Sequence, residues 1–236
     1  MDETDLNQEK KWYYEQRAKI AITNLQKKNM NAIYASTRHE AMQSVLEMIP
    51  AGAKVGRGDS MTVDQIGIIE ELAKRGQNIV IDPLERAADG LFAVPDIKDR
   101  RKLALDVFAS DILLVGVNAV TLDGKLVSTD AWGNRVSATI FGAEKVIILA
   151  GANKIVAGVD QALERIHTYS APMNAKRHAL KHGREDFADL PCARTGICVD
   201  CNHPWRICRY TVIIEGSTLR EKGRINVVLV GEELGI

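Results

Sequence analysis

The sequence predicts an α/β protein with three layers, in which helices cover both faces of a mostly parallel, Rossmann-like central sheet. Two observations predict this fold class. Continuous apolar runs, Ile-Leu-Leu-Val at 112–115 and Val-Ile-Ile-Leu at 146–149, are typical of strands that are buried on both faces. Such strands alternate along the chain with stretches of helical periodicity, and this alternation is typical of parallel sheets.

The N-terminal part of the chain, about 1–50, is expected to be mainly helical. Apolar side chains recur near one face over 7–28, which indicates an amphipathic helix. A short strand is expected at 31–35 and a second helix at 40–49, which Pro50-Ala-Gly52 ends.

From residue 54 onward the order becomes strand, turn and helix. A glycine-containing turn follows the first of these strands and opens a helix that reaches Arg75. Pro172 is expected to separate two later helices. The predicted strands are 54–55, 78–81, 112–116, 145–149, 211–215 and 224–230, the last two joined by a charged turn, and the later predicted helices are 96–109, 156–170 and 173–181.

Length and composition describe an ordinary globular chain of 236 residues with zero net charge. Balanced charge leaves no electrostatic footprint for nucleic acid or an anionic membrane. The longest apolar run, 112–120, is interrupted by Gly116 and Asn118 and is too short to span a bilayer. The polar N-terminus does not resemble a signal peptide. We expect one domain over 1–236, located in the cytoplasm, with no nucleic-acid or membrane partner.

All four cysteines fall within seventeen residues, in a stretch that we call the cysteine segment (190–210). Cys192, Cys198, Cys201 and Cys208 have the spacing Cys-x5-Cys-x2-Cys-x6-Cys. Four soft ligands this close in sequence favour one metal centre, either an iron–sulfur cluster of the 4Fe–4S type or, as the alternative, tetrahedral zinc. Two disulfides, a redox pair with two further thiols, and a zinc site that includes His203 remain open interpretations.

The turn at 56–62 is a candidate site for a small anionic ligand. Glycine allows a tight turn there, and a helix N-terminus offers free N–H groups to an anion. An alternative is a plain helix cap, because Asp, Ser and Thr satisfy first-turn amides. The candidate residues are Gly56, Gly58, Asp59, Ser60 and Thr62.

A second polar group follows the buried strand at 112–116. Asn118, Asp130, Asn134 and Arg135 are candidates for ligand contact or catalysis, because ligands of open α/β sheets bind at the carboxyl ends of strands. A β-hairpin that turns at Asp123-Gly124 explains those two residues but not the other four.

Several motifs resemble the LUD domain of lactate-utilisation proteins, in particular its short stand-alone branch with four cysteines. The resemblance covers nearly the whole chain. Its motifs are Gly116-Val-Asn-Ala-Val-Thr-x-Asp-Gly-x-Leu-Val127, Gly133-Asn-Arg-Val136, Ala150-Gly-x-Asn-Lys154 and Pro191-Cys-Ala-x-Thr-Gly-x-Cys-x-Asp-Cys201.

The resemblance implies a fold of the NagB/RpiA/CoA transferase-like type, which includes ribose-5-phosphate isomerase. The turn at 56–62 is similar to the phosphate loop of those isomerases, and 115–120 is similar to the segment that holds their catalytic aspartate. Here Asn118 stands at the aspartate position, and their following lysine falls at about Ser128 or Thr129. Asparagine cannot act as a carboxylate base, so aldose–ketose isomerisation is not expected.

The resemblance also implies a function. Lactate-utilisation relatives act in a multi-protein system that oxidises L-lactate, so we expect a redox or electron-transfer accessory with a redox protein partner. In that system the cluster belongs to a longer LUD protein with ferredoxin-type spacing, from which this chain departs. The alternatives are a sugar-phosphate or organic-acid enzyme with structural zinc, and a non-catalytic ligand-binding protein.

Overall fold

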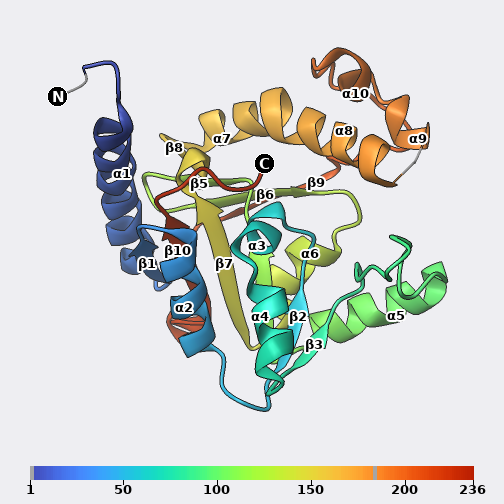
Figure 1. Ribbon diagram of the computed structural model, residues 1–236. Helices are drawn as coiled ribbons and strands as arrows, with labels where there is room; N and C mark the ends of the chain where they lie inside the picture. Colours follow the sequence, from blue (N-terminus) through green and yellow to red (C-terminus); the bar gives the residue numbers. More distant parts are fainter. Residues whose placement is uncertain (1–2, 183–184) are drawn as a thin grey trace.

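The computed structural model describes residues 3–182 and 185–236, in which six strands form one parallel sheet (Figure 1). Its order is β1 (Asn31–Ala35), β10 (Ile225–Val230), β7 (Lys145–Gly151), β4 (Ile112–Gly116), β2 (Lys54–Arg57) and β3 (Ile79–Ile81). The predicted α/β fold with a parallel central sheet is therefore confirmed.

Alternate residues of the central strands supply two separate cores, one on each face of the sheet. In β4, Leu113 and Val115 pack on the side of α1 (Asn7–Lys27) and α5 (Ile97–Phe108). Ile112 and Leu114 pack on the other side, against the helices α2 (Arg38–Met48), α3 (Met61–Ile66) and α4 (Ile68–Arg75). This alternation follows from the two-residue period of a strand and produces the three layers.

A second sheet, which the sequence did not predict, covers part of the α1 side. Within the described residues it has four strands, in the order β8 (Ile155–Val156), β5 (Ala119–Thr121), β6 (Leu126–Asp130) and β9 (Tyr210–Ile214). β5 and β6 form the hairpin expected at Asp123-Gly124. β9 and β10 follow one another in the chain but lie in different sheets.

The breaks between helices differ from the prediction at two places. Gly67, with a φ of +79°, divides the helix expected up to Arg75 into α3 and α4. The break expected at Pro172 is wrong, because α7 (Val159–Arg165), η3 (Ile166–Ser170) and α8 (Ala171–His182) form one helical run. A widened π-type turn precedes Pro172 and accommodates its missing N–H.

The run from α7 to α8 lies across the ends of the central strands (Figure 1). Beyond it come α9 (Glu185–Ala188) and α10 (Pro191–Thr195), which carry the start of the cysteine segment. The shorter elements are α6 (Asn134–Ser137), η1 (Ala138–Gly142), η2 (Ala152–Lys154) and η4 (Leu219–Glu221). In the described ranges no helix combines the length and apolar character needed to cross a membrane.

Candidate functional site

Three neighbouring strands of the central sheet, β7, β4 and β2, end at the same edge, which we call the carboxyl edge. The predicted loop at 56–62 spans the end of β2 and the start of α3, and Asn118 follows β4. Lys154 follows β7. Because ligands of open α/β sheets bind outside the carboxyl ends of strands, this edge is the candidate site.

The predicted glycines of the β2–α3 loop allow close packing. A Cβ on Gly56 would lie 2.9 Å from Val107 Cγ1, and a Cβ on Gly58 would lie 3.2 Å from Arg135 Cγ. Ser60 Oγ accepts a hydrogen bond of 3.3 Å from the backbone N–H of Val63 and caps α3. The helix-cap interpretation is confirmed for Ser60, and anion binding by the loop stays a prediction.

Asp59 faces a cation rather than open solvent. Arg177 Nη2 lies 2.6 Å from its carboxylate, and His178 Nε2 lies 3.9 Å away. Burial opposes ionisation of Asp59, but the facing Arg177 and His178 outweigh it and hold its pKa below the ordinary value. The pair joins the β2–α3 loop to α8.

Asn118 and Arg135, two of the residues predicted from the second polar group, contact each other. Asn118 Oδ1 accepts hydrogen bonds from the backbone N–H of Thr129, at 2.9 Å, and from Arg135 Nη2, at 3.4 Å. Arg135 also donates to the carbonyl oxygens of Gly116 and Thr129. Since the side chain of Arg135 packs on Gly58, the structure brings the two predicted groups together.

Asp130 positions Arg135 through the backbone. Its carboxylate accepts hydrogen bonds from the N–H groups of Ala131, Arg135 and Val136, at 2.7 to 3.2 Å, and so caps α6. Asn134 is exposed at the first position of α6. Asp130 is therefore engaged in shaping the edge, while Asn134 lies at its margin.

Lys154, which ends a LUD-like motif but was not among the predicted site residues, is buried at the carboxyl edge. Its side chain is 4% exposed, and its Nζ donates a hydrogen bond of 3.0 Å to Oγ1 of the fully buried Thr62. Among the described residues, no carboxylate forms an ion pair with Lys154 or contributes to its electrostatic surroundings. The predicted residue Thr62 is thus part of a site built around an unneutralised amine.

Two arginines increase the positive charge around Lys154. Burial, Arg165 and Arg135 together lower the pKa of Lys154 to about 7. Arg165 donates to the carbonyl oxygens of Asn118 and Asn153. Within the described residues neither arginine has a carboxylate within ion-pair distance, and we call Lys154, Thr62, Arg135 and Arg165 the Lys154 site.

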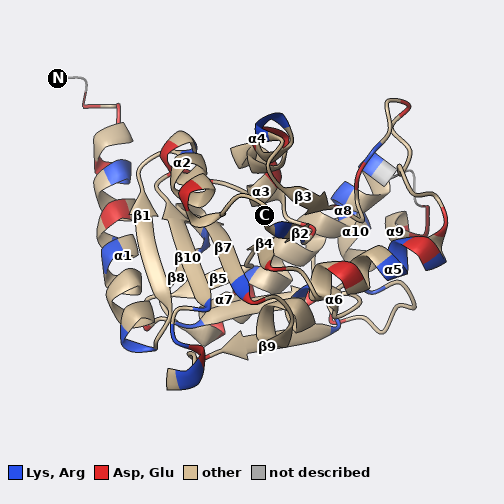
Figure 2. Ribbon diagram, turned by 90° about the horizontal axis from the view of Figure 1, so that it is seen from below, with Lys and Arg blue, Asp and Glu red and all other residues tan. Residues whose placement is uncertain are grey.

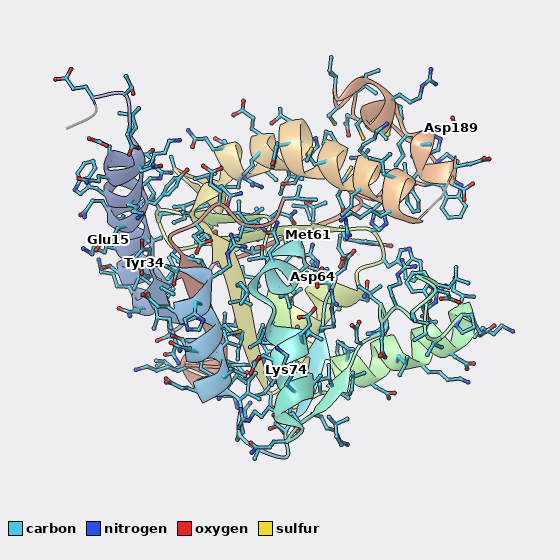
Figure 3. All side chains as sticks on the ribbon, in the orientation of Figure 1. Glu15, Tyr34, Met61, Asp64, Lys74 and Asp189 are labelled. Carbon is cyan, nitrogen blue, oxygen red and sulfur yellow. The ribbon has the colours of Figure 1, made fainter. Side chains whose placement is uncertain are left out.

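The neighbouring Arg57, in contrast to Lys154, has its charge neutralised by two carboxylates. Its guanidinium lies 2.6 Å from Asp64 and 3.1 Å from Asp82. Figure 3 shows Asp64 and Met61 on α3 beneath α8, whereas Lys74 lies at the far end of α4. Within the part of the chain that the structure describes, Arg57 has two carboxylate partners and the Lys154 site has none.

A groove of about 480 Å³ opens between α1 and α7, next to the Lys154 site. It shares Asn153 and Arg165 with the surroundings of Lys154. On its opposite wall the Tyr14 hydroxyl donates to Glu233 at 2.5 Å, and Arg17 donates to the carbonyl oxygen of Ile155 at 2.8 Å. The groove offers space for a ligand body larger than the anionic group.

The cysteine segment carries four half-buried free thiols. Burial raises the pKa of the Cys192 thiol, and the negative charges of Cys201, Cys208 and Cys198 raise it further. The other three thiols therefore lie within electrostatic reach of Cys192.

Within the described residues, three polar contacts hold sulfur atoms of the segment, and one of them is donated by the backbone N–H of Asp200 to Cys198 Sγ at 3.5 Å. Arg206 Nε donates to Cys208 Sγ at 3.2 Å, and Cys198 Sγ lies 3.5 Å from His167 Nδ1. Among the residues that the structure describes, no group of three or more His, Cys, Asp or Glu side chains is placed to hold a metal ion. The donor set fits a four-thiolate site by residue type, while the sulfur atoms do not converge on one point.

Comparison with protein families gives a match to the LUD domain over residues 18–230. The chain belongs to the LUD-domain family. It has no match among curated proteins. Among solved structures it is similar to a DUF162 family protein from Deinococcus radiodurans, with 10% sequence identity, a TM-score of 0.49, and coverage of 93% of this chain and 97% of that chain.

The LUD domain match includes the whole carboxyl edge and the cysteine segment. Of the residues selected from sequence, Gly58, Ser60, Thr62, Asn118 and Arg135 meet at the edge. Lys154 could have been found by the same signal as Asn118, since each polar residue follows a buried apolar strand. Nothing in the local sequence distinguishes Arg165 from the other charged residues of its helix.

Proposed function

We propose that this LUD-domain protein binds a small organic anion, a carboxylate or a phosphate ester, at the Lys154 site. The observation that carries the proposal is the burial of Lys154 beside two arginines, with no carboxylate among residues 3–182 and 185–236 to neutralise them. A buried cation without a counter-charge is costly, and a bound anion would remove that cost.

The contacts of the site support a ligand with one anionic group and a polar body. The guanidinium groups of Arg135 and Arg165 are held in place by backbone carbonyl oxygens, so they are preorganised for an anion. The adjoining groove supplies Arg17 and the hydroxyl of Tyr14.

The arrangement differs from that of the isomerases that the sequence resembles. Asn118 cannot remove a proton as a carboxylate would, and its Oδ1 is engaged with Arg135 and Thr129. A lysine is nevertheless present at the edge, contributed by η2 after β7 rather than by position 128 or 129. This placement favours organic-acid binding over aldose–ketose isomerisation.

Titration calorimetry with inorganic phosphate, lactate and pyruvate tests the proposal. We expect at least one of these anions to bind and Lys154→Met to weaken that binding at least tenfold, since about 1.4 kcal/mol corresponds to a factor of ten. Lys74→Met is the matched control, because Lys74 is exposed at the far end of α4 (Figure 3). Failure of all three anions to bind the wild-type protein would contradict the proposal.

A second candidate function is that of a redox accessory in organic-acid oxidation, with Cys192, Cys198, Cys201 and Cys208 as ligands of a 4Fe–4S cluster. The electrostatic influence of the other three thiols on Cys192 supports it, as does the hydrogen bond from Arg206 to Cys208 Sγ. When bound, such a cluster supplies one-electron transfer, and the guanidinium would offset negative charge on the sulfur. Structural zinc on the same thiols is the alternative.

Metal and sulfide analysis of anaerobically purified protein tests this second function. A brown protein with about four iron atoms per chain would support the cluster, and one colourless zinc would support the alternative. Cys198→Ser should lose either metal, whereas His203→Ala should retain the cluster. Metal-free protein would contradict both assignments.

A further inference from the structure

The amine of Lys154 is enclosed by the Thr62 hydroxyl and the C-terminal turn at Gly235, and this environment is suited to covalent chemistry as well as to ion pairing. Its Nζ contacts the Thr62 hydroxyl, and a Cβ on Gly235 would lie only 2.7 Å from that Nζ. The C-terminal turn is therefore closed over the amine. It is held there by hydrogen bonds from Leu234 N to Asn153 Oδ1 and from Gly235 N to Gln65 Oε1.

The cations of the site divide into two kinds. Arg135 and Arg165 have fixed positions and remain charged, because guanidinium groups do not lose their proton in proteins. Lys154 is the one that these neighbours and its burial press towards the neutral amine. A lysine whose role is only to attract an anion needs surroundings that favour its protonated form. The surroundings of Lys154 favour the neutral form instead.

From this division we propose that Lys154 is a nucleophile that forms an imine with the carbonyl carbon of a 2-oxo acid, whose carboxylate binds Arg135 and Arg165. The inference rests on the proposed anion site and names its substrate class. An amine beside fixed guanidinium groups matches a molecule that carries a carbonyl next to a carboxylate. A 2-hydroxy acid such as lactate has no aldehyde or ketone carbon for the amine to attack, and neither does a phosphate ester group by itself.

The step balances without a further reactant. The lone pair of neutral Nζ forms a C–N bond to the carbonyl carbon while the C–O π electrons move to oxygen, which takes a proton from nitrogen. Loss of water from this carbinolamine gives the imine, so lysine plus 2-oxo acid yields imine plus water. Thr62 Oγ1, already bonded to Nζ, is placed to relay the proton.

Reduction with borohydride in the presence of pyruvate tests the inference, because reduction makes an imine permanent. Peptide mapping of the wild-type protein by mass spectrometry should locate the adduct on Lys154. At pH 7 the neutral fraction of Lys154 exceeds that of an exposed lysine by roughly a thousandfold, so labelling of the peptide with Lys74 should be at least about tenfold lower. Excess lactate, which has no carbonyl carbon to attack, should reduce the labelling by competition.

The outcomes separate this inference from the proposed function. An adduct on Lys154 supports both, and its disappearance in a folded Lys154→Met variant confirms the assignment. Pyruvate binding in calorimetry with no adduct, or with an adduct spread over exposed lysines, overturns the imine and leaves the anion site. Absence of an adduct and of pyruvate binding, with phosphate or lactate still bound, overturns the imine alone. Absence of an adduct together with failure of all three anions to bind overturns both.

Discussion

The carboxyl edge and the cysteine segment are built in opposite ways. At the edge, Thr62 is fully buried and Lys154 is 4% exposed, between the two large cores of the sheet. In the cysteine segment all four thiols are half-buried, and Ile197 and Val199 are mostly exposed. Its own core consists of only Ala175, Leu190 and Ala193 as fully buried members among the described residues.

This difference shows how each region obtains its geometry. The sheet fixes the edge, so its cations stay in place although their burial opposes stability. The cysteine segment has little packing to define one arrangement, and such regions open most easily. The proposed metal would therefore require binding that is coupled to local folding, because the thiols are not arranged to hold a metal ion among the described residues.

The largest effect is expected from titration of Lys154, which tests whether the edge is built at a cost to stability. Below about pH 7 the folded and unfolded states both bind the proton, and the folded state carries the full burial penalty. Between about pH 7 and 10.5 only the unfolded lysine remains protonated, so the free energy of unfolding should rise with pH, by at most about 5 kcal/mol.

Urea unfolding of the wild-type protein and of Lys154→Met between about pH 6 and 10 measures this rise. The variant should be more stable than the wild type at the low end of the range, and the difference should shrink as pH increases. Lys74→Met, with its exposed side chain, should follow the wild-type profile. Parallel profiles for the wild type and Lys154→Met would show that the amine is not perturbed.

A matched pair of leucine truncations compares the cores behind the two regions. Leu149→Ala, in the centre of β7, should lower the free energy of unfolding by about 3 kcal/mol, because the sheet cannot collapse around the cavity. Leu190→Ala should cost about 2 kcal/mol or less and should increase the rate at which a thiol reagent labels Cys192. Leu180→Ala, at an exposed position, is the control. Faster labelling of Cys192 in Leu149→Ala than in Leu190→Ala would contradict the expectation that the cysteine segment opens more easily than the sheet.

Sequence patterns predicted the central sheet well, because its strands are continuous apolar runs. β1 and β4 occupy the predicted ranges, 31–35 and 112–116. The second sheet escaped prediction because β5 has three residues and β8 has two, too few to show a period. Sequence patterns report only on neighbouring residues. These two short strands form because they pair with strands that are distant in the chain, so no local pattern marks them.

The sequence predicted which loops contribute to the candidate site, but it did not predict which charged side chains are buried or paired there. Thr62, Asn118 and Arg135 were selected because polar residues follow strands. The burial of Lys154 depends on Thr62, 92 positions away in the chain, and the neutralisation of Asp59 depends on Arg177, 118 positions away. Figure 2 shows acidic and basic residues interspersed along α1. Because charges of both signs are mixed along the sequence, a cation without a carboxylate partner can be recognised only when its spatial neighbours are known.

The smallest effect concerns the link between the two regions, the ion pair of Asp59 and Arg177. Asp59 directly precedes the Ser60 cap, and Arg177 lies on α8, whose Ala175 belongs to the core of the cysteine segment. A double-mutant cycle with Asp59→Asn and Arg177→Met should give a coupling energy of about 1 kcal/mol, because the pair is partly exposed. The exposed pair Glu15–Lys19 should give about 0.5 kcal/mol or less.

The cycle also decides whether the regions act separately. If the ion pair transmits order, each single variant should both weaken anion binding at the edge and speed thiol labelling of Cys192. Stability loss without either change would restrict the pair to holding α8 in place. In that case the rigid edge and the loosely packed thiols would be independent sites on one LUD domain, although both Arg177 and His178 of α8 face the carboxylate of Asp59 in the β2–α3 loop.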